Sequence, residues 1–159
     1  MCSEGDEIMV KKDKRLGPIL TLRGRVPTNT ANHKINLFDG RFDTGFKLVS
    51  FEIVSPTPTD TDQEATGTLY NRKQSGFSRE WNFADVEQVG WAGWMIPIGS
   101  RFGVWSLVDD ETILVEDLFM HCYGATESDD FNYIIKLQKY DITEWEGALS
   151  LVSRKGSYG

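Results

Sequence analysis

Apolar and polar side chains alternate along several stretches of the chain, most clearly just after residue 130. There the apolar residues of one parity are Phe131, Tyr133, Ile135 and Leu137. The positions between them are polar, apart from Ile134. A period of two is typical of a β-strand with one buried and one wetter face. This segment is therefore predicted to be a strand whose apolar face belongs to the core.

A second apolar run, at residues 113–123, precedes this strand. It is too short to cross a membrane as a helix, which takes roughly 20 residues. The residues between the two runs include glycine, serine and two aspartates, which favour turns. We expect the two runs to form an antiparallel pair joined by a long hairpin loop.

Similar apolar runs recur along the rest of the chain, separated by turn-forming residues. Strands are predicted at residues 16–26, 34–43, 46–54, 67–72, 88–98 and 102–108. The 34–43 segment contains Asp39-Gly40, a tight-turn signal, while 27–33 is predicted to be irregular and the proline-containing 55–65 an exposed loop. Seven or eight short strands, spaced by roughly ten residues, are typical of a sandwich or barrel. We expect an all-β fold, a two-sheet antiparallel β-sandwich that is jelly-roll-like.

The two ends of the chain differ from this strand pattern. Residues 1–14 mix charges without apolar periodicity, which predicts a flexible arm ahead of a single domain at 15–159. Thr143 and Glu146 have the spacing of a capping box, so a short C-terminal helix is expected near 144–153. Trp145 is a candidate anchor for that helix, and Phe51 is expected in the core with the apolar residues of 131–137.

Charge narrows the range of partners. Seventeen basic and twenty-four acidic residues give a net charge of −7, which disfavours broad nucleic-acid binding because such binding needs a basic surface. The basic residues cluster once, at Lys11, Lys12, Lys14 and Arg15. This cluster is either a solvated tail or a contact with an acidic neighbour or a nucleic acid. The polar start resembles no signal peptide and no run could span a membrane, so we expect synthesis in a cytoplasm and no membrane partner.

No arrangement of reactive residues indicates catalysis. His121 and Cys122 are adjacent, but neighbouring side chains on a strand point to opposite faces and cannot readily form a dyad. The two histidines lack the spacing of a zinc site, and the acidic turn residues do not follow a calcium-loop pattern. A small hydrolase would need Asp110, Glu116 or Glu87 in a cleft. We expect no enzyme, no metal and no cofactor.

Four of the five tryptophans lie between residues 81 and 105. Trp91 and Trp94 stand near acids and amides, so they are candidates for stacking on sugar rings or for subunit contacts. They are three residues apart and would face opposite ways on a regular strand, with one in the core and one at a contact. This pattern makes a carbohydrate-binding β-sandwich module, with surface tryptophans, the alternative function.

The order of four segments resembles that of small virion proteins of marine and freshwater bacteriophages. The segments, which span roughly residues 35–153, read KINLFDGRFDTGFKLVSFEIV, WNFADVEQVGWA, SLVDDETILVEDLFMHCYG and NYIIKLQKYDITEWEGALSLV. The resemblance implies a β-sandwich that assembles in many copies in or on a capsid, as shell subunit or decoration protein. Its partners would be other copies of itself and other virion proteins, and its location the virion. No functional residue carries over from this resemblance.

Overall fold

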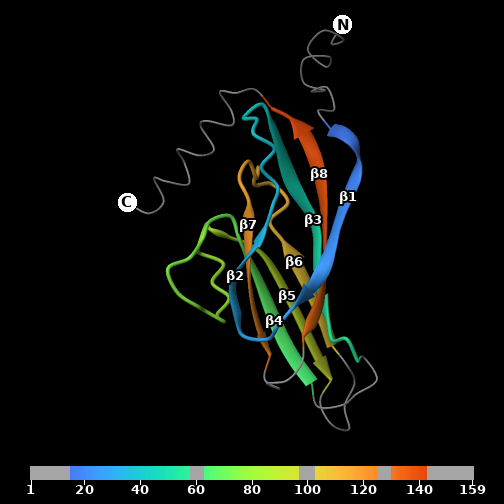
Figure 1. The fold of residues 1–159 in the computed structure, drawn as a ribbon, viewed down its shortest axis with the longest axis vertical. Coiled ribbons are helices and arrows are strands. Elements are labelled where there is room, and N and C mark those ends of the chain that lie inside the picture. The colour runs from blue at the N-terminus through green and yellow to red at the C-terminus, as the bar shows by residue number, and fades with distance from the viewer. Residues whose placement is uncertain (1–14, 58–62, 97–102, 125–129, 143–159) are drawn as a thin grey trace, which may run out of the picture.

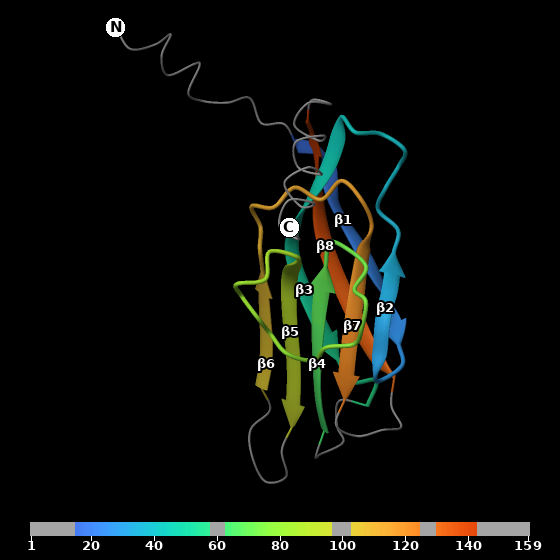
Figure 2. The ribbon, with the colours of Figure 1, turned by 90° about the vertical axis from the view of Figure 1, so that its left-hand side faces the viewer.

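The structure of the chain, a computed structural model, describes residues 15–57, 63–96, 103–124 and 130–142. These residues form eight β-strands and no helix. The strands are β1 (Arg15–Val26), β2 (Thr30–Ile35), β3 (Thr44–Val54), β4 (Gln63–Tyr70), β5 (Gln88–Ile96), β6 (Gly103–Val108), β7 (Leu118–Gly124) and β8 (Phe131–Asp141). Figures 1 and 2 show them as two facing layers.

The two layers are antiparallel sheets, so the predicted β-sandwich is confirmed. The smaller sheet has the order β1-β8-β3, and the larger has the order β2-β7-β4-β5-β6. β1 therefore pairs with β8, β2 with β7 and β4 with β5. The Ser106 hydroxyl on β6 donates to the Phe51 carbonyl on β3, which links the remaining two strands. The pairs β1 with β8, β2 with β7 and β4 with β5 are those of a jelly roll, whereas β6 pairs with β5 in the larger sheet and not with β3.

The core lies between the sheets and is built from the alternating apolar residues of both. Phe51, Ile135 and Leu137 are fully buried, as predicted, and Tyr133 is partly buried against the same cluster. Val49, Phe51 and Ile53 share one parity of β3, yet Val49 is exposed whereas the other two are buried. A bulge between Leu48 and Ser50 shifts the register there and turns Val49 outward.

The predicted hairpin between 113–123 and the strand after residue 130 is wrong. β7 lies in the larger sheet and β8 in the smaller, and each is a central strand with two neighbours. The apolar pattern of both segments reflects burial, and burial does not specify which strands pair. Residues 27–33 were predicted to be irregular, whereas β2 begins at Thr30. The 34–43 segment is a strand only as far as Ile35, and the rest of it is a loop.

Several predictions concern residues outside the described part of the chain. These are the N-terminal arm with Lys11, Lys12 and Lys14, and the C-terminal helix with Trp145. Among the described residues no helix is long and apolar enough to cross a membrane.

Candidate functional site

The outer face of the larger sheet is partly covered by the 71–87 loop, which crosses in front of β5, β4 and β7 in Figure 2. Hydrogen bonds attach this loop to the sheet. Gln88 donates from Nε2 to the Glu80 carbonyl (3.2 Å) and accepts the Asn82 backbone N–H at Oε1 (2.8 Å). Asn32 exchanges two hydrogen bonds of 2.9 Å with the backbone of Gln74. The loop is therefore a fixed part of this face.

Trp91 and Trp94 are both buried, at 8% and 5% exposure, so their assignment as surface contact residues is corrected. Trp94 belongs to the core between the sheets. Trp91 lies on the other face of β5, where its Nε1 donates to Gln88 Oε1 (2.8 Å) and Phe83 packs edge-on against its ring. The two indoles do face opposite ways, but the chain's own loop covers the outer one.

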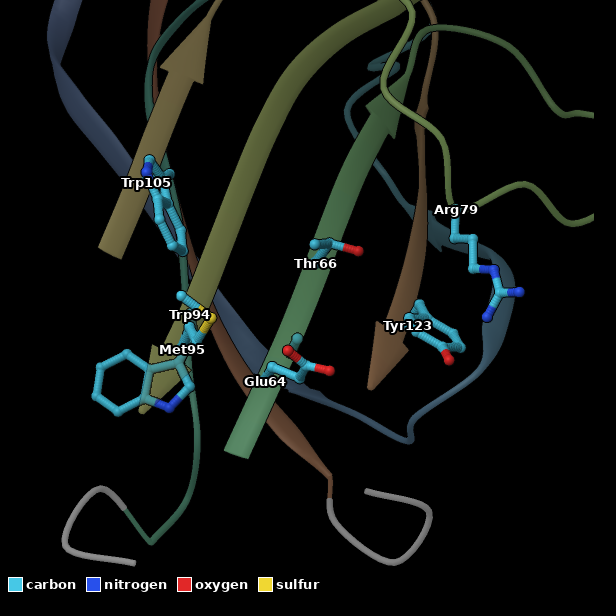
Figure 3. A pocket seen from close by; sticks show the side chains of 8 residues that line it. Glu64, Thr66, Arg79, Trp94, Met95, Trp105 and Tyr123 are labelled. Carbon is cyan, nitrogen blue, oxygen red and sulfur yellow. The ribbon is translucent and has the colours of Figure 1, made fainter. Parts of the chain in front are cut away.

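An open groove lies on this outer face, and of the two tryptophans only Trp94, a core residue, borders it. The groove has a volume of about 340 Å³ and is lined by Glu64, Ala65, Thr66, Arg79, Trp94, Met95, Trp105 and Tyr123. Figure 3 shows Trp105 on one side, Arg79 and Tyr123 on the other, and Thr66 and Glu64 between them. A second hollow of about 290 Å³ shares Thr66, Arg79 and Trp105 with the first and adds Trp81. The two hollows form one surface, which we call the aromatic groove.

Two glycines position Trp105 in the groove. Gly93 is its cross-strand partner on β5, and Gly103 lies two residues before it on β6. A Cβ at Gly93 would stand 2.9 Å from Cε3 of Trp105, and one at Gly103 would stand 3.0 Å from its Cη2. The six-membered ring of the indole therefore lies over the backbone of both glycines, where any side chain would displace it. Trp105 remains 46% exposed, so much of its surface is open to a ligand.

The opposite wall of the groove carries a positioned cation. The Arg79 guanidinium lies over the ring of Tyr123, with Cζ 4.5 Å from the ring centroid. Such stacking holds the planar guanidinium while leaving its N–H donors free to point sideways. Glu64 supplies carboxylate acceptors, and Thr66 supplies a hydroxyl that can donate or accept. The groove thus combines aromatic surface with a few polar groups of both hydrogen-bonding types.

The residues considered for catalysis are not brought together. Cys122 lies in the core, and burial raises its pKa to about 12, which makes it a poor nucleophile. His121, on the opposite face, lies under the 71–87 loop between the rings of Tyr70 and Phe77. Burial lowers its pKa, only partly offset by its hydrogen bond with Ser78. The thiol and the imidazole therefore point apart, as the sequence predicted.

The carboxylates considered for hydrolysis differ in their surroundings. Asp110 and Glu116 are exposed, whereas Glu87 is buried and accepts a hydrogen bond from Gln74 Nε2 (2.8 Å). Within the described ranges, no group of three histidine, cysteine, aspartate or glutamate side chains is placed to hold a metal ion.

A separate exposed apolar surface lies on the smaller sheet, at the beginning of β1. Its residues are Leu16, Ile19 and Leu20, which are 40–50% exposed, and together we call them the β1 patch. Leu20 pairs with the core residue Leu137, so Leu20 and its chain neighbour Ile19 point to opposite faces of the strand. The register with β8 shifts between Leu16 and Leu20, and Gly17 has φ of +70°. The buried Gln138 side chain donates to the carbonyls of Gly17 (3.2 Å) and Lys139 (3.1 Å). This bulge in the backbone is therefore held from within the sheet.

No protein-family model matches the sequence, and no curated protein matches it. The similarity to phage virion proteins stays a prediction from the order of segments.

Proposed function

We propose that this chain is a structural protein of a virus particle, either a shell subunit or a decoration protein on a shell. The observation that carries the proposal is the β1 patch, three large apolar side chains on an edge strand of a jelly-roll sandwich. Jelly rolls are a common architecture of capsid domains. Exposed large apolar side chains on an edge strand are a liability in a monomer, and a partner can cover them.

Charge supports a second copy of the chain as that partner. Arg15, Arg23 and Arg25 are exposed along β1, beside the patch. The chain as a whole carries a net charge of −7, so the rest of the chain is net acidic. The basic residues along β1 are complementary in charge to an acidic region on a second copy of the chain. A contact between two different surfaces of identical subunits builds a closed ring or shell when the rotation that relates neighbouring subunits returns to its starting point.

The proposal is tested by the mass of the protein in solution, measured by light scattering behind size-exclusion chromatography. We expect a symmetric oligomer or a closed particle instead of the 18.0 kDa monomer. Ile19→Lys should shift the population toward monomer, because it places a charge at the most exposed of the three apolar positions. Val86→Lys is the matched control, since Val86 is equally apolar and also exposed but lies in the 71–87 loop.

Negative-stain images of the same sample would separate the two roles. A closed particle made of this chain alone indicates a shell subunit, and a small ring that binds preformed shells indicates a decoration protein. A wild-type chain that stays monomeric at high concentration and binds no shell would contradict both.

A further inference from the structure

We propose that the aromatic groove binds a neutral carbohydrate, with one hexopyranose ring stacked on Trp105. The site is a separate function from assembly, because it lies on the outer face of the larger sheet, whereas the β1 patch is on the edge of the smaller one. It also differs from the site that Trp91 and Trp94 suggest in the sequence, since both of those are buried.

The first argument is the shape and placement of Trp105. Its indole is supported from below by the backbone of Gly93 and Gly103 and cannot sink further into the sheet. Its remaining surface is open, at 46% exposure, beside a hollow of about 340 Å³. This volume falls within the range of roughly 300–1,000 Å³ of small-ligand sites. A supported ring next to a hollow is suited to a flat ligand that lies against it.

The second argument is the chemistry that surrounds the ring. The C–H face of a pyranose is apolar and slightly positive, so it is attracted to the negative face of an indole. The hydroxyls at the edge of the sugar each donate and accept hydrogen bonds. The groove offers both types, with donors from Arg79, acceptors from Glu64 and a hydroxyl from Thr66. Figure 3 shows these groups across the groove from Trp105.

The third argument is charge, which decides between classes of ligand. The groove contains one carboxylate, Glu64, and one guanidinium, Arg79, so it carries no net charge. An anionic sugar or a phosphate backbone would meet Glu64, and the whole chain is acidic, which disfavours polyanions further. A cationic ligand would meet Arg79. A neutral polyol satisfies both groups at once, and it is the occupant that we assign.

The test is binding of the intact chain to arrayed neutral oligosaccharides of glucose, galactose, mannose and N-acetylglucosamine, with acidic oligosaccharides on the same array. Titration calorimetry with the strongest neutral oligosaccharide then gives an affinity. Trp105→Ala is expected to weaken binding by about tenfold or more, since it removes the stacking surface. Arg79→Leu is expected to weaken it by a smaller factor. Phe42→Ala is the matched control, an exposed aromatic residue outside the groove that should bind as the wild type does.

A variant that leaves Trp105 in place provides independent evidence. Gly93→Ala would put a methyl group within 2.9 Å of the indole and tilt it, so binding should fall although no ligand-contacting side chain is lost. Circular dichroism and the melting temperature confirm that each variant is folded.

The proposal is overturned by any of three results: no neutral oligosaccharide binds, only acidic ones bind, or folded Trp105→Ala binds as tightly as wild type. Loss of self-association in Trp105→Ala, without sugar binding by the wild type, would also overturn it and would identify the groove as a contact between copies. Failure here leaves the assembly proposal standing, because that proposal depends on the effect of Ile19→Lys.

Discussion

Asp117 is predicted to hold the 36–43 loop against the start of β7, and its replacement should measurably destabilise the protein. Its Oδ1 accepts the backbone N–H of Leu37 (2.7 Å) and of Phe38 (2.9 Å). Lys34 Nζ lies 3.3 Å from Oδ2. Burial by itself raises the pKa of Asp117, but the two N–H donors and Lys34 together bring it below its ordinary value. The carboxylate is therefore charged and paired in the folded protein.

The size of the effect follows from how buried each partner is. Leu37 is buried, so its N–H would lose a charge-assisted hydrogen bond worth about 1.5–3 kcal/mol without replacement by water. Phe38 is exposed, so water can take over much of the second bond. The ion pair with Lys34, whose side chain is mostly exposed, contributes roughly 0–1 kcal/mol. Asp117→Ala should thus cost about 2–4 kcal/mol of unfolding free energy. Asp117→Asn keeps an acceptor and should cost less.

Urea unfolding at neutral pH, followed by tryptophan fluorescence, measures this cost, and Asp110→Ala serves as the control because Asp110 is exposed. The pH dependence checks the mechanism. Because the native pKa of Asp117 is lowered, its contribution is complete above the unfolded value of about 3.9 and is lost as the pH falls through the native pKa. The difference between wild type and Asp117→Ala should therefore shrink in acid. Equal urea midpoints at neutral pH, or a difference that persists below both pKa values, would refute the reasoning.

Two further predictions concern His121 and Cys122, which are adjacent on β7. In a Cys2→Ser background, Cys122 should not react with a thiol reagent until the protein unfolds, because it is fully buried and its pKa is raised to about 12; rapid reaction in buffer would contradict this burial. His121 has a lowered pKa, so the unfolded state takes up its proton first and the urea midpoint should fall as the pH drops below about 6.5. His121→Phe should reduce the dependence of the urea midpoint on pH. If that dependence is unchanged in the variant, it arises from groups other than His121.

The strands were largely predictable from the sequence, whereas their pairing was not. Alternation identified most of them because each strand has one face toward the core, as in the 131–137 segment. Alternation does not specify which strands are hydrogen-bonded neighbours. The sequence therefore predicts a pair of β7 and β8, although these strands lie in different sheets. The pattern does not predict β2, because its sequence TANHKI contains few apolar residues. Among the described strands, β2 pairs with β7 alone.

The aromatic groove could be predicted only in part. The sequence shows a cluster of tryptophans, but it predicts Trp91 and Trp94 as the surface residues, and both are buried. Trp94 is buried between the two sheets. The burial of Trp91 depends on the 71–87 loop, which packs over β5 through contacts that are distant in sequence. A usable signal was the pair of glycines, Gly93 and Gly103, near Trp105, since small residues across from an indole leave room for it to lie on the sheet.

The bulge near the beginning of β1 restricts how neighbours can attach. Pro18 has no backbone N–H, and Gly17 adopts a left-handed conformation, so this part of the edge cannot continue a regular ladder. A further strand therefore has no regular template along this part of the edge. Leu16, Ile19 and Leu20 are left to mediate contact through side-chain packing alone. In the proposed assembly, such a joint would form and separate reversibly, so that misplaced subunits would be released before a particle closes.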